Sequence, residues 1–103
     1  MKEEIISIET VVSKMLIEKN LTISTAESCT GGLVSATLIN YPGISSVFIE
    51  GCVTYSNESK INRLGVNPNT LKIHGAVSEE TAREMAEGIA KNFDTNVAIS
   101  TTG

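Results

Sequence analysis

The stretch Ala26-Glu27-Ser28-Cys29-Thr30-Gly31-Gly32 decides the fold that this 103-residue chain predicts. Before it, residues 21–26 alternate apolar or β-branched residues with smaller or polar ones, a pattern typical of a β-strand. After it, residues 33–40 predict a helix that is entered by a tight turn, with Ser28 and Thr30 as candidate N-caps. Ligands bind at this edge of open α/β sheets, where a strand ends and a helix begins.

The sequence on both sides continues the alternation of helices and strands. Apolar residues recur at helical spacing over residues 3–19. The further expected elements are a strand over 47–55, helices over 56–64, 67–74 and 78–93, and a strand over 96–102. Gly51 indicates a bulge or a close approach of another backbone within its strand. Because the connections are too long for hairpins, we expect an α/β fold, a three-layer α/β/α sandwich with a mixed or mostly parallel sheet.

The four residues at the C-terminus indicate how much of the domain the sequence contains. Ser100-Thr101-Thr102-Gly103 resembles the beginning of a turn that leads out of a strand. We therefore expect residues 1–103 to form a single domain that is incomplete at its C-terminus. A frayed end that carries a glycine is the alternative.

The composition excludes several classes of function. Twelve carboxylates against eight Lys plus Arg, with no basic cluster and 4% aromatic residues, argue against nucleic-acid binding. No apolar stretch is long enough to span a membrane, and the N-terminus has no signal-peptide core, so we expect a cytoplasmic protein. Two cysteines and one histidine favour neither a disulfide framework nor a metal site. We expect no metal and no cofactor.

Two residues of the turn compete as nucleophile. A catalytic Cys29 would need a nearby base, and the only histidine, His74, lies far along the chain, so we expect Cys29 to be buried and inert. A triad of Ser28 and His74 stays open because such partners meet in space, although His74 also fits a helix-capping role. The simpler alternative is that Ser28 or Thr30 only caps the helix and the glycines only make the turn.

Lys60 is the candidate base. With Ser56 as N-cap, Lys60 falls in the first turn of a helix, where the positive end of the dipole disfavours an ammonium ion. A desolvated lysine there can lose its proton and activate a serine without histidine. The alternative is a solvated Lys60 paired with Glu58.

Six motifs, at residues 25–32, 53–60, 64–66, 74–78, 85–88 and 101–103, carry a family resemblance. In sequence and in order they resemble the C-terminal domain of CinA, the competence/damage-inducible protein, and the related stand-alone nicotinamide-nucleotide amidohydrolases. The resemblance covers nearly the whole chain after Leu21.

The resemblance implies hydrolysis of the carboxamide of nicotinamide mononucleotide to nicotinic acid mononucleotide and ammonia, a metal-independent step of pyridine-nucleotide salvage. In that reaction Ser28 would be the nucleophile, Lys60 the general base, and Tyr55 would position or polarise the reacting groups. The substrate-binding residues would be Thr30, Gly31, Gly32 and Thr102, with amides of the Ser28 turn near the oxyanion.

Two other functions stay open. Family domains resemble one another for roughly half as much sequence again beyond Gly103, in keeping with domain lengths of about 100–150 residues. The chain could therefore be a catalytically inactive module for nucleotide binding or oligomerisation. It could also be a regulatory or structural part of a larger CinA-like assembly. An incomplete α/β domain leaves apolar surface exposed, so we expect a homo-oligomer, most simply a dimer.

Overall fold

The computed structural model describes residues 6–103, and its elements alternate helices with strands. In chain order they are α1 (Ile8–Lys19), β1 (Ile23–Glu27), α2 (Leu33–Ile39), the short 3-10 helix η1 (Ile44–Ser46), β2 (Phe48–Val53), α3 (Asn57–Leu64), α4 (Pro68–His74), α5 (Glu79–Phe93) and β3 (Val97–Thr101). The three strands form a sheet in the order β2-β1-β3, with both pairings parallel. No helix of residues 6–103 combines the length and apolar character that crossing a membrane requires.

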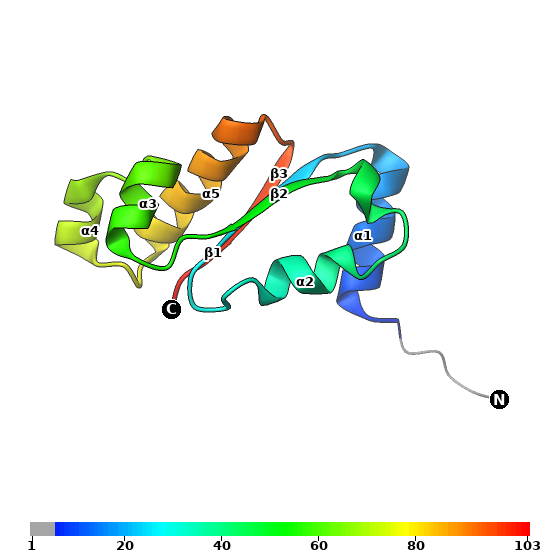
Figure 1. The fold of residues 1–103 in the computed structure, drawn as a ribbon, viewed down its shortest axis with the longest axis horizontal. Coiled ribbons are helices and arrows are strands. Elements are labelled where there is room, and N and C mark those ends of the chain that lie inside the picture. The colour runs from blue at the N-terminus through cyan, green and yellow to red at the C-terminus, as the bar shows by residue number, and fades with distance from the viewer. Residues whose placement is uncertain (1–5) are drawn as a thin grey trace.

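Helices cover both faces of the sheet. The ribbon places α1 and α2 on one side of the strands and α3, α4 and α5 on the other (Figure 1). The predicted three-layer α/β/α arrangement is confirmed, with a sheet that is parallel throughout the described residues.

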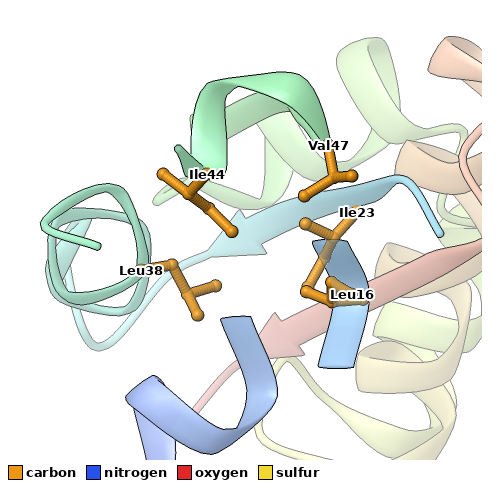
Figure 2. Close-up of a cluster of buried hydrophobic side chains, with 5 residues drawn as sticks. All are labelled: Leu16, Ile23, Leu38, Ile44 and Val47. Atoms are coloured by element: carbon orange, nitrogen blue, oxygen red, sulfur yellow. The ribbon is translucent and has the colours of Figure 1, made fainter. Parts of the chain in front are cut away.

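The side chains of the central strand, β1, alternate between the two faces of the sheet and so contribute to two hydrophobic cores. All five residues of β1 are buried. Ile23 packs into a cluster with α1, α2 and η1, and Figure 2 shows Leu16, Leu38, Ile44 and Val47 converging with it. Ala26 belongs to a second cluster on the opposite face, whose other buried members are Leu64, Val66, Met85 and Ile89. The central strand therefore joins two apolar layers that have no helix in common.

Serine side chains cap the starts of α1, α3 and α5. Ser56 and Ser78, the predicted N-caps of α3 and α5, each accept a hydrogen bond from the amide three residues later. The first helix, α1, begins at Ile8, because Ser7 is its N-cap and accepts from the Thr10 amide, so the predicted helix is wrong at residues 6–7. The part of that predicted helix over residues 3–5 lies outside the described residues.

Two glycines mark close packing. Ile23 pairs with Phe48 and the next residue, Ser24, pairs with Glu50, so the β1–β2 register skips Ile49. The irregularity that was expected at Gly51 therefore lies at Ile49, two residues earlier in β2. A Cβ at Gly51 would instead lie 2.6 Å from the Ser35 hydroxyl, and thus the close approach comes from side chains.

The second glycine, Gly88, lies on α5 where α3 ends. A Cβ there would clash with the carbonyl oxygen of Leu64. The crossing of α3 over α5 therefore depends on the absence of a side chain at this position.

Candidate active site

The carboxyl ends of the three parallel strands meet at one edge of the sheet. Ser28 follows β1, Tyr55 lies two residues beyond β2, and Thr102 follows β3. A cavity of about 390 Å³ opens there, within the usual size range of small-molecule sites. Its lining residues are Ser28, Cys29, Tyr55, Lys60, Ala76, Val77, Thr102 and Gly103.

Ser28 and Lys60 are in direct contact. The Lys60 ammonium nitrogen lies 3.1 Å from the Ser28 hydroxyl oxygen, 3.0 Å from the Thr54 carbonyl oxygen and 2.9 Å from the Tyr55 carbonyl oxygen. Ser28 is 8% exposed and Lys60 only 1%. Two backbone carbonyls thus hold the end of the lysine side chain against the hydroxyl.

Burial without a counter-ion makes the Lys60 charge unfavourable. No carboxylate of the described residues lies within 4 Å of its nitrogen. Burial lowers the pKa of Lys60 from its ordinary value, since the charged form loses its hydration. The alternative of a solvated Lys60 paired with Glu58 is wrong.

The same contacts suit the neutral amine. A neutral amine has two hydrogens and one lone pair. The carbonyls of Thr54 and Tyr55 can accept the two hydrogens, which leaves the lone pair directed at the Ser28 hydroxyl. In this state Ser28 donates to Lys60, the arrangement that a general base requires.

The turn after Ser28 owes its shape to glycine. Gly31 and Gly32 have φ values of 59° and 104°, in the left-handed region that other residues avoid. The N-cap of α2 is Gly32, which offers no side chain. Neither Ser28 nor Thr30 caps this helix, so the simple capping alternative does not describe the turn.

Glu27 performs the capping for which Ser28 and Thr30 were the candidates. Its fully buried carboxylate accepts hydrogen bonds from the amides of Gly32, Val34 and Ser35 and from the hydroxyls of Thr30 and Ser35. Burial by itself would raise the pKa of Glu27, but the hydrogen bonds from Ser35, Thr30 and the helix amides outweigh it and leave the pKa below its ordinary value. Sequence reasoning missed this residue; an acidic residue shortly before a glycine-rich helix start was the available signal.

The amides of the turn are mostly occupied. The Ser28 amide donates to the Thr101 carbonyl and the Gly31 amide to the Ser28 carbonyl. Within residues 6–103, the amides of Cys29 and Thr30 have no protein acceptor. Cys29 lines the cavity. These two amides are the free donors closest in sequence to the Ser28 hydroxyl.

The other predicted site residues take different positions. Thr102 lines the cavity, and its hydroxyl donates to the Ala76 carbonyl at 2.7 Å. Tyr55 is 74% exposed at the cavity, and its hydrogen bond with Lys60 is made by the backbone carbonyl. Thr30, Gly31 and Gly32 are not among the lining residues.

Cys29 and His74 are the other two residues that the sequence suggested for the reaction. Cys29 is a free, exposed thiol, so the expectation of a buried residue is wrong: Cys29 lies in the turn beyond β1, where neither apolar layer covers it. His74 ends α4 and lies 3.7 Å from the Glu80 carboxylate. The structure therefore pairs Ser28 with Lys60 and gives His74 a different partner.

Metal-binding side chains do not gather anywhere in residues 6–103. No three or more side chains of the His, Cys, Asp or Glu types come close enough together there to hold an ion.

Comparison with known proteins gives a consistent result. The CinA C-terminal domain family matches residues 5–103. A Clostridioides difficile protein named "Putative competence-damage inducible protein" is 70% identical over 97 residues, which are 94% of this chain and 23% of that protein.

Solved structures agree with this match. The competence damage-inducible protein A of Klebsiella pneumoniae superposes with a TM-score of 0.89 at 38% identity, over 92% of this chain and 59% of that one. A competence/damage inducible protein of Agrobacterium tumefaciens gives a TM-score of 0.86 at 38% identity, over 99% of this chain and 64% of that one. The chain thus spans about a quarter of the curated relative and about three fifths of the solved chains.

Proposed function

The chain belongs to the CinA C-terminal domain family, and from this premise we propose that it carries the site of an amidohydrolase acting on nicotinamide mononucleotide. The products are nicotinic acid mononucleotide and ammonia. Ser28 is the nucleophile and Lys60 the general base. The observation that carries the proposal is the buried contact of 3.1 Å between these two side chains.

The first half of the reaction forms an ester. Neutral Lys60 takes the proton of the Ser28 hydroxyl while the Ser28 oxygen attacks the carboxamide carbon. The carbonyl oxygen becomes an oxyanion, and we assign the free amides of Cys29 and Thr30 as its donors. Lys60 then gives the proton to the nitrogen, and ammonia leaves as the C–N bond breaks.

The second half returns Ser28 to its starting state. Lys60, neutral again, takes a proton from water, and the resulting hydroxide attacks the ester carbon. When the bond to Ser28 breaks, Lys60 returns the proton to the Ser28 oxygen. The carbonyls of Thr54 and Tyr55 keep the Lys60 nitrogen in place through both halves.

The cavity supports a substrate with a neutral reacting end. Lys60 is the one basic side chain among the eight lining residues, none of which is acidic, and its nitrogen already contacts Ser28 and two carbonyls. The exposed Tyr55 ring offers a flat apolar face of the kind that stacks on aromatic rings. A planar heteroaromatic carboxamide fits both features.

The test is ammonia release from nicotinamide mononucleotide by the chain and by Ser28→Ala. We expect the substitution to lower release by at least about a thousandfold, because no other group takes the place of the nucleophile. Ser45→Ala is the matched control: it makes the same substitution at an exposed serine outside the cavity and should keep at least about half of the activity. Equal release by the chain and Ser28→Ala would exclude the role of Ser28.

The second candidate is a module that binds the nucleotide without turnover, and it is favoured by the exposed Tyr55 ring at the cavity, which can stack on a base whether or not Ser28 reacts. Calorimetric binding of nicotinamide mononucleotide with no ammonia release would support it. Turnover that depends on Ser28 would exclude it.

A further inference from the structure

We propose that Glu27 is a positioning residue, which shapes the turn between Ser28 and α2 so that the amides of Cys29 and Thr30 stay free for the oxyanion. The inference rests on the proposed function, because it takes Ser28 as the nucleophile. Glu27 and Ser28 are consecutive and lie on opposite faces of the sheet. The Glu27 side chain contacts α2, and the Ser28 side chain contacts Lys60.

The Glu27 carboxylate is too buried to serve only as a solvated charge. It is fully buried, and no basic side chain of residues 6–103 lies within 4 Å of it. A buried charge is costly unless hydrogen bonds satisfy it. Both oxygens are satisfied: Oε1 accepts from the Thr30 hydroxyl at 2.6 Å and the Val34 amide at 2.8 Å, and Oε2 accepts from the amide and hydroxyl of Ser35.

These bonds determine which amides remain free. The carboxylate occupies the amides of Gly32, Val34 and Ser35, and the Leu33 amide donates to the Thr30 carbonyl. None of these four amides is therefore left for substrate. The turn amides that remain are those of Cys29 and Thr30.

The same network reaches the backbone of the nucleophile. The Thr30 hydroxyl, which donates to Glu27, lies 2.7 Å from the Thr101 hydroxyl. The Thr101 carbonyl in turn accepts from the Ser28 amide at 2.9 Å. Glu27 is thus connected to both ends of the turn: through α2 at Gly32, and through Thr30 and β3 at Ser28.

Glutamine at position 27 would keep the size and break the network. One carboxylate oxygen faces three donors and the other faces two. Hydroxyls can turn to accept a hydrogen bond, but backbone amides cannot. Whichever oxygen became an amino group, at least one backbone amide would therefore face another donor, and the turn would have to move. A displacement of about 1 Å at a reacting group can cost about a hundredfold in rate.

The experiment compares Glu27→Gln with the unchanged chain in two measurements. The first is kcat and KM for nicotinamide mononucleotide, and the second is the rate at which a fluorophosphonate labels Ser28, followed by mass spectrometry. Glu84→Gln is the matched control, because Glu84 also caps a helix, accepting from the Asn67 amide at 2.8 Å and the Thr70 hydroxyl at 2.6 Å, but lies outside the cavity.

We expect Glu27→Gln to lower kcat and the labelling rate about 10- to 100-fold with KM changed less than about threefold, at a temperature where circular dichroism finds both variants folded. Glu84→Gln should change both rates less than about twofold. Equal losses in the two variants, or unchanged labelling in Glu27→Gln, would overturn the inference.

Three further outcomes are distinguishable. If Glu27→Gln does not fold, Thr30→Val tests the inference instead, because valine keeps the shape of threonine and removes the hydrogen bonds to Glu27 and Thr101. We expect Thr30→Val to slow labelling of Ser28 about tenfold. Unchanged labelling would overturn the inference. Labelling that depends on Glu27 without any turnover would overturn the proposed substrate and leave the inference standing. Failure of the probe to label Ser28 in the unchanged chain would overturn both.

Discussion

At the scale of single residues, Lys60 and Glu27 are both buried, but their surroundings favour neutral Lys60 and ionised Glu27. Each is a buried ionisable group without a partner of opposite charge within 4 Å in the described residues. Five donors surround Glu27, so its charge is retained and the pKa falls. Lys60 has only two carbonyls and a hydroxyl, so its charge is disfavoured and the pKa also falls. The first group is fixed as an anion, and the second becomes available as a base.

The pH dependence of the reaction tests the role of Lys60. Only the neutral amine can take the Ser28 proton, so kcat/KM should rise with pH and level off above the lowered pKa of Lys60, below the ordinary lysine value of 10.5. Lys60→Arg should abolish turnover, by about a thousandfold or more, because arginine keeps its proton. Binding of nicotinamide mononucleotide should change little.

Substitution of the other candidate base provides the control. His74→Asn should leave the pH profile unchanged, because His74 contacts Glu80 and not Ser28. If Lys60→Arg kept most of the activity, Lys60 would be structural and His74 the next candidate.

Glu27 should make the fold sensitive to acid. Its pKa in the folded chain lies below the ordinary value of 4.5, so the folded state binds fewer protons than the unfolded chain. The stability that Glu27 contributes is therefore present above about pH 4.5 and is lost as the pH falls through the lowered pKa. Urea unfolding of the chain and of Glu27→Gln, at about pH 7 and about pH 3, measures this.

We expect the gap in unfolding free energy between the two proteins to be narrower at the lower pH, because the folded chain loses the ionised carboxylate there. The exposed Glu58 provides the control: Glu58→Gln should show no such narrowing. A gap that stays constant with pH would contradict an ionised Glu27.

Local sequence was enough to predict some of these residues and not others. Ser28 lies at a strand end before two glycines, and Lys60 lies in a helix first turn, and both features are readable from neighbours along the chain. That the two touch was not readable, because it depends on how β1 and α3 are placed around the sheet. The exposure of Cys29 was missed because the general tendency of cysteine to be buried does not apply to a turn at a cavity.

At the scale of elements, the order and type of the α-helices and strands followed from periodicity and capping, whereas the 3-10 helix η1 was not predicted. The starts of α3 and α5 were predictable because Ser56 and Ser78 accept hydrogen bonds from residues three positions away. The start of α1 was not, since apolar spacing does not locate a cap. The packing at Gly51 and Gly88 could not be predicted, because the atoms in contact are distant in sequence.

The crossing of α3 and α5 gives a prediction at this scale. Gly88→Ala should destabilise the fold by about 1–3 kcal/mol, although alanine favours helices, because its Cβ would meet the Leu64 carbonyl. Displacement of α3 would also move Lys60, so labelling of Ser28 should slow. Glu87→Ala, at the exposed neighbouring position of α5, should change the unfolding free energy by less than about 0.5 kcal/mol in urea titrations. Equal stability of Gly88→Ala and the unchanged chain would contradict the close crossing.

At the scale of the whole molecule, one apolar groove is left uncovered by the described residues. It has a volume of about 350 Å³ and lies between α1, α2 and β3. Its walls are formed by Ile8, Glu9, Val12, Leu33, Val34, Thr37, Leu38 and Ile99. Ile8 and Leu33 are 73% and 65% exposed. Apolar surface of this kind tends to be covered by association.

We expect residues 1–103 to self-associate through this groove, most simply as a two-fold dimer, because a second copy presents the same apolar surface. Sedimentation equilibrium should therefore give a mass that rises with concentration above the 11.0 kDa of one chain. The double change Ile8→Gln and Leu33→Gln should return the monomer mass without lowering stability, since both side chains are exposed in the single chain. Ile73→Gln is the matched control, because Ile73 is 74% exposed on α4, outside the groove, and should leave association intact. A mass of 11.0 kDa at every concentration would show that the groove is not an interface between copies of this chain.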